Sequence, residues 1–195
     1  MLIDMHVHTR FSPCSIIRIR QLPRKIQEAG IDGVCITDHD TTASLSLLKS
    51  LSDTSGICII VGIEYTTSRG DFLVFGPVER IPPGMSAEKI LKWAKKEGGI
   101  AIPAHPFRKS RPADPSILSS FEILEVLNGR NRPEENESCA KWIRRHGNNK
   151  KGIGGSDAHT LEEVGRIVTL FEKNIHGVED LIKELRQGKY SVLQR

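Results

Sequence analysis

The segment "LPRKIQEAGIDGVCIT" (residues 22–37) sets the folding pattern of the chain. Residues 22–30 are typical of a helix that ends at Gly30, because glycine readily adopts the left-handed conformation that closes a helix. The β-rich run at residues 33–37 predicts a strand. Since "MLIDM" (residues 1–5) also predicts a strand, the segment completes a strand–helix–strand unit, which favours a parallel sheet.

The same alternation continues to the end of the chain. The sequence predicts a turn at Arg69-Gly70, further helices at residues 42–52, 86–98, around 114–120, 133–147 and 177–188, and further strands at residues 57–65, 70–76, 99–104, 121–128, 152–156 and 166–172. Five or more such units favour an α/β fold of the TIM-like barrel type, with an open doubly wound sheet left open as the alternative. We find no linker or repeat, so we expect a single domain over residues 1–195.

The bulk composition is that of a globular protein, with 38% apolar and 27% charged residues among 195. The longest apolar stretch, "ICIIVGI" (residues 57–63), is too short to cross a bilayer, and the N-terminus lacks a secretion signal. We therefore expect a soluble, cytoplasmic protein that does not act at a membrane. The sequence does not indicate an oligomeric state.

The charge indicates the kind of binding partner, and the cysteine spacing indicates the state of the thiols. The net charge of +4 is spread along the chain, which suits an anionic small molecule better than a nucleic-acid tract. The four cysteines, Cys14, Cys35, Cys58 and Cys139, lack CxxC spacing, so we expect reduced thiols.

Polar residues follow the predicted strands, and all of them except Asp38 are candidate metal ligands. They are His6 and His8, then Asp38 and His39 in "TDHD", Glu64 in "GIEY", His105 in "PAHP", and Asp157 and His159 in "GSDAH". In an α/β barrel the C-terminal ends of the strands share one face, so these side chains are expected to converge there. Five of the seven histidines belong to this set.

The spacing within these motifs suits a metal site. Residues two apart on a strand point to the same side, so HxH offers two nitrogens to one metal and DxH offers an oxygen and a nitrogen. Imidazole and carboxylate ligands suit zinc, manganese or iron. Seven candidate ligands exceed one tetrahedral site, which predicts two or three divalent ions with Glu64 as a bridging ligand.

Each motif taken alone has a simpler explanation. "TDHD" could begin a helix, with Asp38 or Asp40 as its N-cap, "PAHP" could be a rigid loop, and "GSDAH" a turn. These explanations do not account for the fact that all four motifs, these three and the His6/His8 pair, follow predicted strands. Metal binding is therefore favoured.

At these motifs the chain resembles the PHP (polymerase and histidinol phosphatase) superfamily. The matching segments, in order, are "DMHVHTRFS", "GIDGVCITDHDT", "GIEYTT", "PAHP", "EVLNGRN" and "GSDAH", and they extend from Asp4 to about Phe171. The resemblance implies a distorted (β/α)7 TIM-like barrel with a metal cluster, often trinuclear, at the C-terminal ends of the strands.

The resemblance also assigns the ligands by position. It implies a first metal on His6, His8, Glu64 and Asp157, a second on Glu64 and His105, and a third on His39 and His159.

The chain departs from the family pattern at the second and third sites. After HxH the family commonly has another His or Asp, whereas this chain has "SPCS", where Pro13 cannot ligate and Cys14 is the nearest substitute. Asn128 replaces a histidine found in certain members, and Asp71 is a further possible ligand. Two ions are therefore expected, and a third is left open.

These residues predict a metal-dependent phosphoesterase, a phosphatase or phosphodiesterase. Its substrate is expected to be a small phosphorylated metabolite or nucleotide, and its nucleophile a metal-bridged hydroxide. Asp38 and Asp4 are candidates to orient ligand histidines, and Arg130 is a candidate to contact phosphate. The run "FRKSR" (residues 107–111) is either a phosphate contact or a solvated loop, and the general acid is unassigned.

Two alternatives from other classes remain. One is a PHP module that binds metal without catalysis, against which the full set of ligands argues. The other is an amidohydrolase-like enzyme that cuts a C–N bond.

Overall fold

The computed structural model describes residues 1–146 and 150–195, with the side chains of residues 49 and 53–55 left out. The strands are β1 (Leu2–Val7), β2 (Gly33–Ile36), β3 (Cys58–Val61), β4 (Ile63–Thr67), β5 (Gly70–Phe75), β6 (Ile100–Pro103), β7 (Ile123–Asn128), β8 (Lys151–Gly155), β9 (Ile167–Phe171) and β10 (Tyr190–Gln194). The helices are α1 (Leu22–Ala29), α2 (Leu45–Ser55), α3 (Ala87–Lys96), α4 (Pro115–Leu118), α5 (Pro133–Arg145) and α6 (Val178–Gln187). Short 3-10 helices cover Ile19–Gln21, Val78–Arg80 and Leu161–Glu163.

The strands form three sheets, with the orders β10-β9-β1-β2-β3, β4-β5-β6 and β7-β8. The pairs β1–β2, β2–β3 and β7–β8 are parallel, as the alternation of strands and helices predicts. The expectation of parallel strands is wrong for β5 and β9, which run antiparallel to their neighbours. For β5 the reason is the short turn before it, because a parallel pairing with β4 would need a crossover of a dozen or more residues.

The three sheets contact one another at two places. Strand β1 lies beside β8, and β6 lies beside β7. Two isolated parallel bridges, Val7 with Ala158 and His39 with Glu64, each link a strand to a segment outside the strands. Within the described residues, 1–146 and 150–195, backbone hydrogen bonds do not join the three sheets into a closed barrel. The structure therefore shows a mixed α/β fold, and the barrel stays a prediction.

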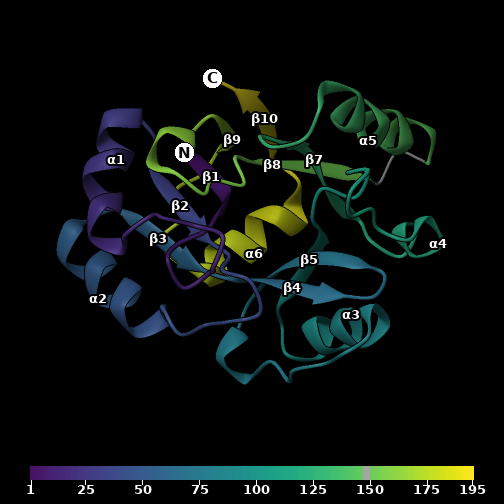
Figure 1. Cartoon of the computed structure of the whole chain (residues 1–195), viewed down its shortest axis with the longest axis horizontal. Helices are drawn as coiled ribbons and strands as arrows, with labels where there is room; N and C mark the ends of the chain where they lie inside the picture. Colours follow the sequence, from purple (N-terminus) through teal and green to yellow (C-terminus); the bar gives the residue numbers. More distant parts are fainter. Residues whose placement is uncertain (147–149) are drawn as a thin grey trace.

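The hydrophobic core lies between the sheets and under the helices. Ile3, Met5 and Phe75 on the strands pack in one cluster with Leu181 and Leu185 of α6. Figure 1 shows α1 and α2 beside β2 and β3, α3 beside β4 and β5, and α5 beside β7. Helices α1, α2, α3 and α5 therefore cover the outer faces of the sheets, whereas α6 packs into the core cluster, and the strand ends carry polar residues.

Several element boundaries differ from the sequence-based expectation. The predicted strand at 57–65 is two strands interrupted at Gly62, where a Cβ would lie 2.6 Å from the Phe75 ring. Strand β10 was not expected, and the predicted helix at 133–147 is observed to Arg145, while its last residue, Gly147, lies outside the described residues.

All four cysteines are unpaired. No helix in the described ranges combines the length and apolar composition that crossing a bilayer requires.

Candidate metal centre

The bridge between Val7 and Ala158 aligns the HxH and DxH motifs. The His8 N–H donates to Ala158 O at 2.9 Å, and the Ala158 N–H donates to His6 O at 3.2 Å. This register sets the side chains of His6 and His8 beside those of Asp157 and His159. Residues about 150 positions apart in the chain thus enter one site through two backbone hydrogen bonds.

The second bridge places Glu64 beside the "TDHD" motif. The Glu64 N–H donates to Asp38 O at 3.2 Å, and the Asp40 N–H donates to Glu64 O at 3.0 Å. His39 therefore lies opposite Glu64, and its Nδ1 is 3.1 Å from Glu64 Oε2.

Close approach and backbone strain mark the same strand ends. A Cβ on Gly155 would lie 2.4 Å from the Cβ of His6, so β8 can approach β1 only with glycine there. His105 and Asp157 adopt positive φ angles of 31° and 53°, which side chains other than glycine rarely do. Such strain persists where the surrounding structure holds it, and it is frequent at functional sites.

Four side-chain atoms converge on one buried point, and we call the residues that provide them, His6, His8, Glu64 and Asp157, the tetrad. The two histidine Nε2 atoms lie 3.0 Å apart. From His6 Nε2 the distance is 3.2 Å to Glu64 Oε2 and 3.6 Å to Asp157 Oδ1, and from His8 Nε2 these distances are 3.1 and 3.3 Å. No tetrad side chain is more than 3% exposed.

The tetrad has the dimensions of a metal site. Nitrogen and oxygen ligands about 2.1 Å from a tetrahedral ion lie about 3.4 Å from one another, which matches the observed separations. Burial works against a charged imidazole, yet Asp157, Glu125 and Glu64 raise the pKa of His6 well above its usual value. The pKa of Glu64 stays well below its usual value, because His6 and His105 outweigh the effect of burial. The tetrad therefore requires a positive charge at its centre, and a divalent cation fits.

Glu125, which the sequence analysis missed, fixes the ring of His6. The His6 Nδ1 lies 2.9 Å from Glu125 Oε1 inside the protein, so with a metal bound Nδ1 would carry the hydrogen and Nε2 would offer its lone pair. The other oxygen, Oε2, accepts from the His105 N–H at 2.7 Å and from Asn128 Nδ2 at 3.0 Å. The signal for Glu125 was a carboxylate between the apolar residues Leu124 and Val126 of a predicted strand.

Asp38 reaches the centre through Ser12. Ser12 Oγ donates to Asp38 Oδ1 at 2.7 Å and lies 3.2 Å from His8 Nδ1, so the serine can accept the hydrogen of that ring nitrogen. Asp38 also accepts from the Thr9 N–H and hydroxyl, each at 2.7 Å. The structure therefore places Asp38 one residue away from a histidine rather than in direct contact with its ring.

Asp4 supports backbone rather than an imidazole. It accepts from the backbone N–H groups of His6, Ser156 and Gly165 at 3.3, 2.8 and 2.9 Å. Burial raises the pKa of Asp4 to about 6 despite these bonds. Asp4 thus ties β1 to the end of β8, just below the tetrad.

A second group, Glu64, Asp71 and His105, shares Glu64 with the tetrad. Glu64 Oε1 lies 2.8 Å from His105 Nε2, and Asp71 Oδ2 lies 4.0 Å from the same nitrogen. Burial and the charge of Glu64 raise the pKa of Asp71 to about 6. Asp71 Oδ1 is buried and has no hydrogen-bond partner among the described residues. An unpaired buried oxygen beside a histidine and a carboxylate fits a second cation bridged by Glu64.

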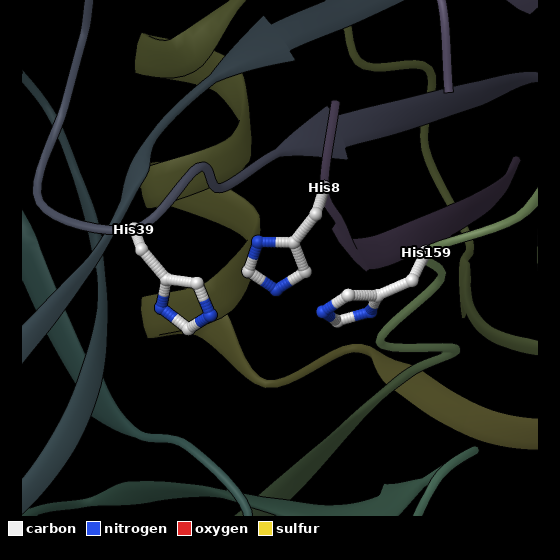
Figure 2. A group of neighbouring side chains, drawn as sticks. All are labelled: His8, His39 and His159. Carbon is white, nitrogen blue, oxygen red and sulfur yellow. The ribbon is translucent and has the colours of Figure 1, made fainter. Parts of the chain in front are cut away.

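The third group consists of three histidines, His8, His39 and His159. Figure 2 shows the ring of His8 between the other two, and each flanking ring centre lies 4.5 Å from that of His8. Burial lowers the pKa of both His39 and His159, which favours neutral imidazoles. Cys14 belongs to this side, because its Sγ lies 3.1 Å from His159 Nε2.

Two arginines near the centre, Arg108 and Arg130, make different contacts. Arg108, in the run "FRKSR", donates from Nη2 to Asp157 Oδ2 at 2.7 Å and to Asn128 Oδ1 at 2.8 Å. It therefore orients a ligand carboxylate rather than forming a solvated loop. Arg130 is 44% exposed and only approaches Glu163, at 3.4 Å.

The structure thus brings together all seven predicted ligands, with Asp71 and Cys14 beside them. The spacing of the donor atoms in the tetrad supports metal binding there. Glu125, Ser12 and Arg108 are the additional residues that the fold places in contact with ligands.

Comparison with known proteins finds one matching family model and several proteins of similar sequence. A family model described as PHP-associated matches residues 133–190. Two uncharacterised proteins of Methanocaldococcus jannaschii are similar, one 32% identical over 68% of this chain and 84% of the relative, the other 28% identical over 93% and 75%. A phosphoribosyl 1,2-cyclic phosphate 1,2-diphosphodiesterase of Eggerthella lenta is 33% identical over 36% of this chain and only 28% of its own length.

Solved structures share the fold. A candidate metal-dependent phosphoesterase of Bifidobacterium adolescentis has a TM-score of 0.69 and 20% identity, covering 95% of this chain and 96% of its own. PsfC of Pseudomonas syringae has a TM-score of 0.77 and 18% identity, covering 100% and 91%. An amidohydrolase of Chromobacterium violaceum has a TM-score of 0.66 and 16% identity, covering 98% and 97%. At these identities the likeness is one of fold.

Proposed function

Since the chain belongs to the PHP superfamily, we propose that it is a metal-dependent phosphoesterase, a phosphatase or phosphodiesterase. Its substrate would be a small phosphorylated metabolite or nucleotide. The observation that carries the proposal is that the His6 and His8 Nε2 atoms, 3.0 Å apart, each lie 3.1 to 3.6 Å from a Glu64 oxygen and an Asp157 oxygen inside the protein. The names of the Eggerthella and Bifidobacterium relatives support the reaction class.

The tetrad would hold one divalent ion, and Glu64, His105 and Asp71 a second. His39, His159 and Cys14 would hold a third where it is filled. The nitrogen and oxygen donors suit zinc, manganese or iron. When bound, such ions supply an activated water at neutral pH and neutralise charge on the phosphoryl oxygens.

The chain's own residues keep the ligands in position. Glu125 holds His6 in the tautomer that presents Nε2, and Ser12, held by Asp38, does the same for His8. Arg108 fixes the second oxygen of Asp157, so that Oδ1 points into the tetrad. Such supporting contacts affect metal affinity by about 10–100-fold.

Arg130 would contact the phosphate. Its guanidinium is 44% exposed and its contact with Glu163 is long, so it can turn towards an anion. Arginine suits this role because its planar group can donate two parallel hydrogen bonds to phosphate oxygens.

The distorted (β/α)7 barrel and the single domain over residues 1–195 are also proposals. The contacts of β1 with β8 and of β6 with β7 support the barrel, because they join neighbouring sheets around the core.

Turnover of phosphate esters tests the function. Protein stripped with a chelator is reloaded with Mn²⁺ or Zn²⁺ and assayed on p-nitrophenyl phosphate and bis-p-nitrophenyl phosphate. We expect turnover that needs the metal and falls to background in His8→Ala and in Asp157→Asn. His176→Ala, which changes an exposed histidine away from the centre, is the matched control and keeps full activity.

The other outcomes distinguish the alternatives. Turnover of an amide but of no phosphate ester would identify a C–N hydrolase. Metal binding without turnover of either would identify a non-catalytic module. Circular dichroism of each variant separates loss of the site from loss of the fold.

A further inference from the structure

Three side chains of the loop after β6 lie against the metal centre. They belong to His105, Arg108 and Arg111, which are spaced three residues apart, and backbone hydrogen bonds of 2.9 and 3.1 Å link each position to the next. His105 Nε2 lies 2.8 Å from Glu64 Oε1, Arg108 Nη2 lies 2.7 Å from Asp157 Oδ2, and Arg111 Nε lies 2.7 Å from Asp71 Oδ2. One loop therefore contacts both the tetrad and the second group.

The two arginines of this loop hold different oxygens of their carboxylates. Arg108 contacts Asp157 through Oδ2, and the other oxygen, Oδ1, lies 3.3 Å from a histidine nitrogen of the tetrad. Arg111 instead contacts Asp71 through Oδ2, which is also the oxygen that lies 4.0 Å from His105 Nε2. Arg108 therefore leaves the inner oxygen of its carboxylate to the tetrad, whereas Arg111 holds the oxygen that faces the second group.

The pair of Arg111 and Asp71 joins a half-exposed cation to a buried anion. The side chain of Asp71 is 0% exposed, whereas that of Arg111 is 47% exposed. Asp71 Oδ2 has no hydrogen-bond partner among the described residues, so the contact is an ion pair without an aligned N–H group. Arg111 Nη2 donates to Thr66 Oγ1 at 3.1 Å. The guanidinium can therefore turn into solvent, while the carboxylate of Asp71 stays inside the protein.

Arg111 and a cation in the second group would share one carboxylate. The ligand atoms of Glu64, Asp71 and His105 lie within 4.8 Å of one another, so a cation among them would lie close to the guanidinium on Asp71. Two positive charges a few ångströms apart repel strongly where the surroundings are partly buried. Arg111 also neutralises the carboxylate charge that would attract the cation. The guanidinium and the cation therefore oppose each other at Asp71.

We propose that Arg111 competes with the second metal ion for Asp71, so that this ion binds only when the guanidinium has moved away. This rests on the proposed function, because it assumes a second ion held by Glu64, His105 and Asp71. The competition makes the second ion bind more weakly than the first, so the number of bound ions depends on the metal concentration. The described contacts of the Arg111 side chain do not include the tetrad, so the first ion is unaffected.

Stepwise binding of Mn²⁺ tests the competition without catalysis. Protein stripped with a chelator is titrated at pH 8, well above the pKa of about 6 to which burial raises Asp71, and free Mn²⁺ is measured by electron paramagnetic resonance. We expect Arg111→Gln to bind the second ion about tenfold more tightly than the wild type, and the first ion equally tightly. Asp71→Asn should abolish the second step, and Arg111→Gln added to Asp71→Asn should then have no effect.

The matched control removes one positive charge from the same loop. Lys109 is exposed and forms no ion pair with a described carboxylate, so Lys109→Gln should leave both binding steps unchanged. If Arg111→Gln bound the second ion as the wild type does, or more weakly, the competition would be refuted. A second ion bound by neither protein would refute it as well. If Arg111→Gln strengthens the second step but no phosphate ester is turned over, the proposed function fails and the role of Arg111 stands.

Discussion

Replacing Glu125 by glutamine should weaken metal binding without touching a ligand. Glu125 is fully buried and accepts three contacts, from His6 Nδ1 at 2.9 Å, the His105 N–H at 2.7 Å and Asn128 Nδ2 at 3.0 Å. Glutamine has one oxygen, so at least one of these donors would face an NH₂ group. Leaving a buried donor without an acceptor costs about 1–3 kcal/mol.

This loss should appear mainly as reduced affinity for the metal. With Nδ1 of His6 no longer held, Nε2 is free to turn away from the tetrad, and we expect metal affinity to fall about 10–100-fold, or about 1.4–2.7 kcal/mol. The assay is competition for Zn²⁺ or Mn²⁺ with a chromophoric chelator, alongside thermal unfolding. Glu122→Gln, at an exposed position three residues earlier, is the control and should bind metal as the wild type does. If Glu125→Gln bound metal with wild-type affinity, the supporting role assigned to Glu125 would be refuted.

Three further predictions follow from the same geometry. Gly155→Ala puts a Cβ 2.4 Å from that of His6 and should destabilise the protein by more than about 2 kcal/mol in urea unfolding, whereas Gly177→Ala meets only a side-chain oxygen at 3.6 Å and should cost less than about 1 kcal/mol. Neighbouring carboxylates raise the pKa of His6, so the His6 imidazole is protonated at pH 7 without metal and binding of one ion should release about one proton. Metal affinity should therefore fall as pH falls. Calorimetry in buffers of different ionisation enthalpy measures the proton release, and a binding reaction that releases no proton would contradict the prediction. In Co²⁺-loaded protein with the third site filled, the Cys14 thiolate should give a near-ultraviolet sulfur-to-cobalt absorption that Cys14→Ser removes, and an unchanged spectrum would rule Cys14 out as a ligand.

The ligand residues could be predicted from the sequence more readily than the residues that hold them in position. His6 and His8 stand two apart at a strand end, and Asp157 and His159 repeat this spacing, so local alternation is enough to predict that each pair shares a side. Their meeting depends on one bridge between Val7 and Ala158, which is a long-range feature. Parallel strand ends nevertheless predict it, because they share one face.

The supporting residues were harder to foresee because their roles depend on tertiary contacts. Glu125 lies 119 positions from His6, and no local pattern connects them. The run that contains Arg108 allowed either a phosphate contact or a solvated loop, because its partners Asn128 and Asp157 come from β7 and from the segment after β8. Ser12 carries no signal of its own in a polar loop.

The sheet topology was predictable only in part. The parallel pairs follow from helices between strands, as in β1–α1–β2. The sequence does predict the turn at Arg69-Gly70 that precedes β5. A turn this short allows only antiparallel pairing with β4, so at this position the turn decides the strand direction and the overall α/β pattern does not. Strand β10 escaped prediction because Tyr190–Gln194 lies at the edge of the sheet, where its side chains are half-buried or exposed, and its sequence does not alternate cleanly between apolar and polar residues.

A crystal structure of the Mn²⁺- or Zn²⁺-loaded protein, with anomalous scattering recorded at the metal edge, tests the central claim most directly. We predict an anomalous peak about 2.0–2.2 Å from His6 Nε2, His8 Nε2, a Glu64 oxygen and an Asp157 oxygen. An anomalous map with no peak among these four atoms would contradict the account.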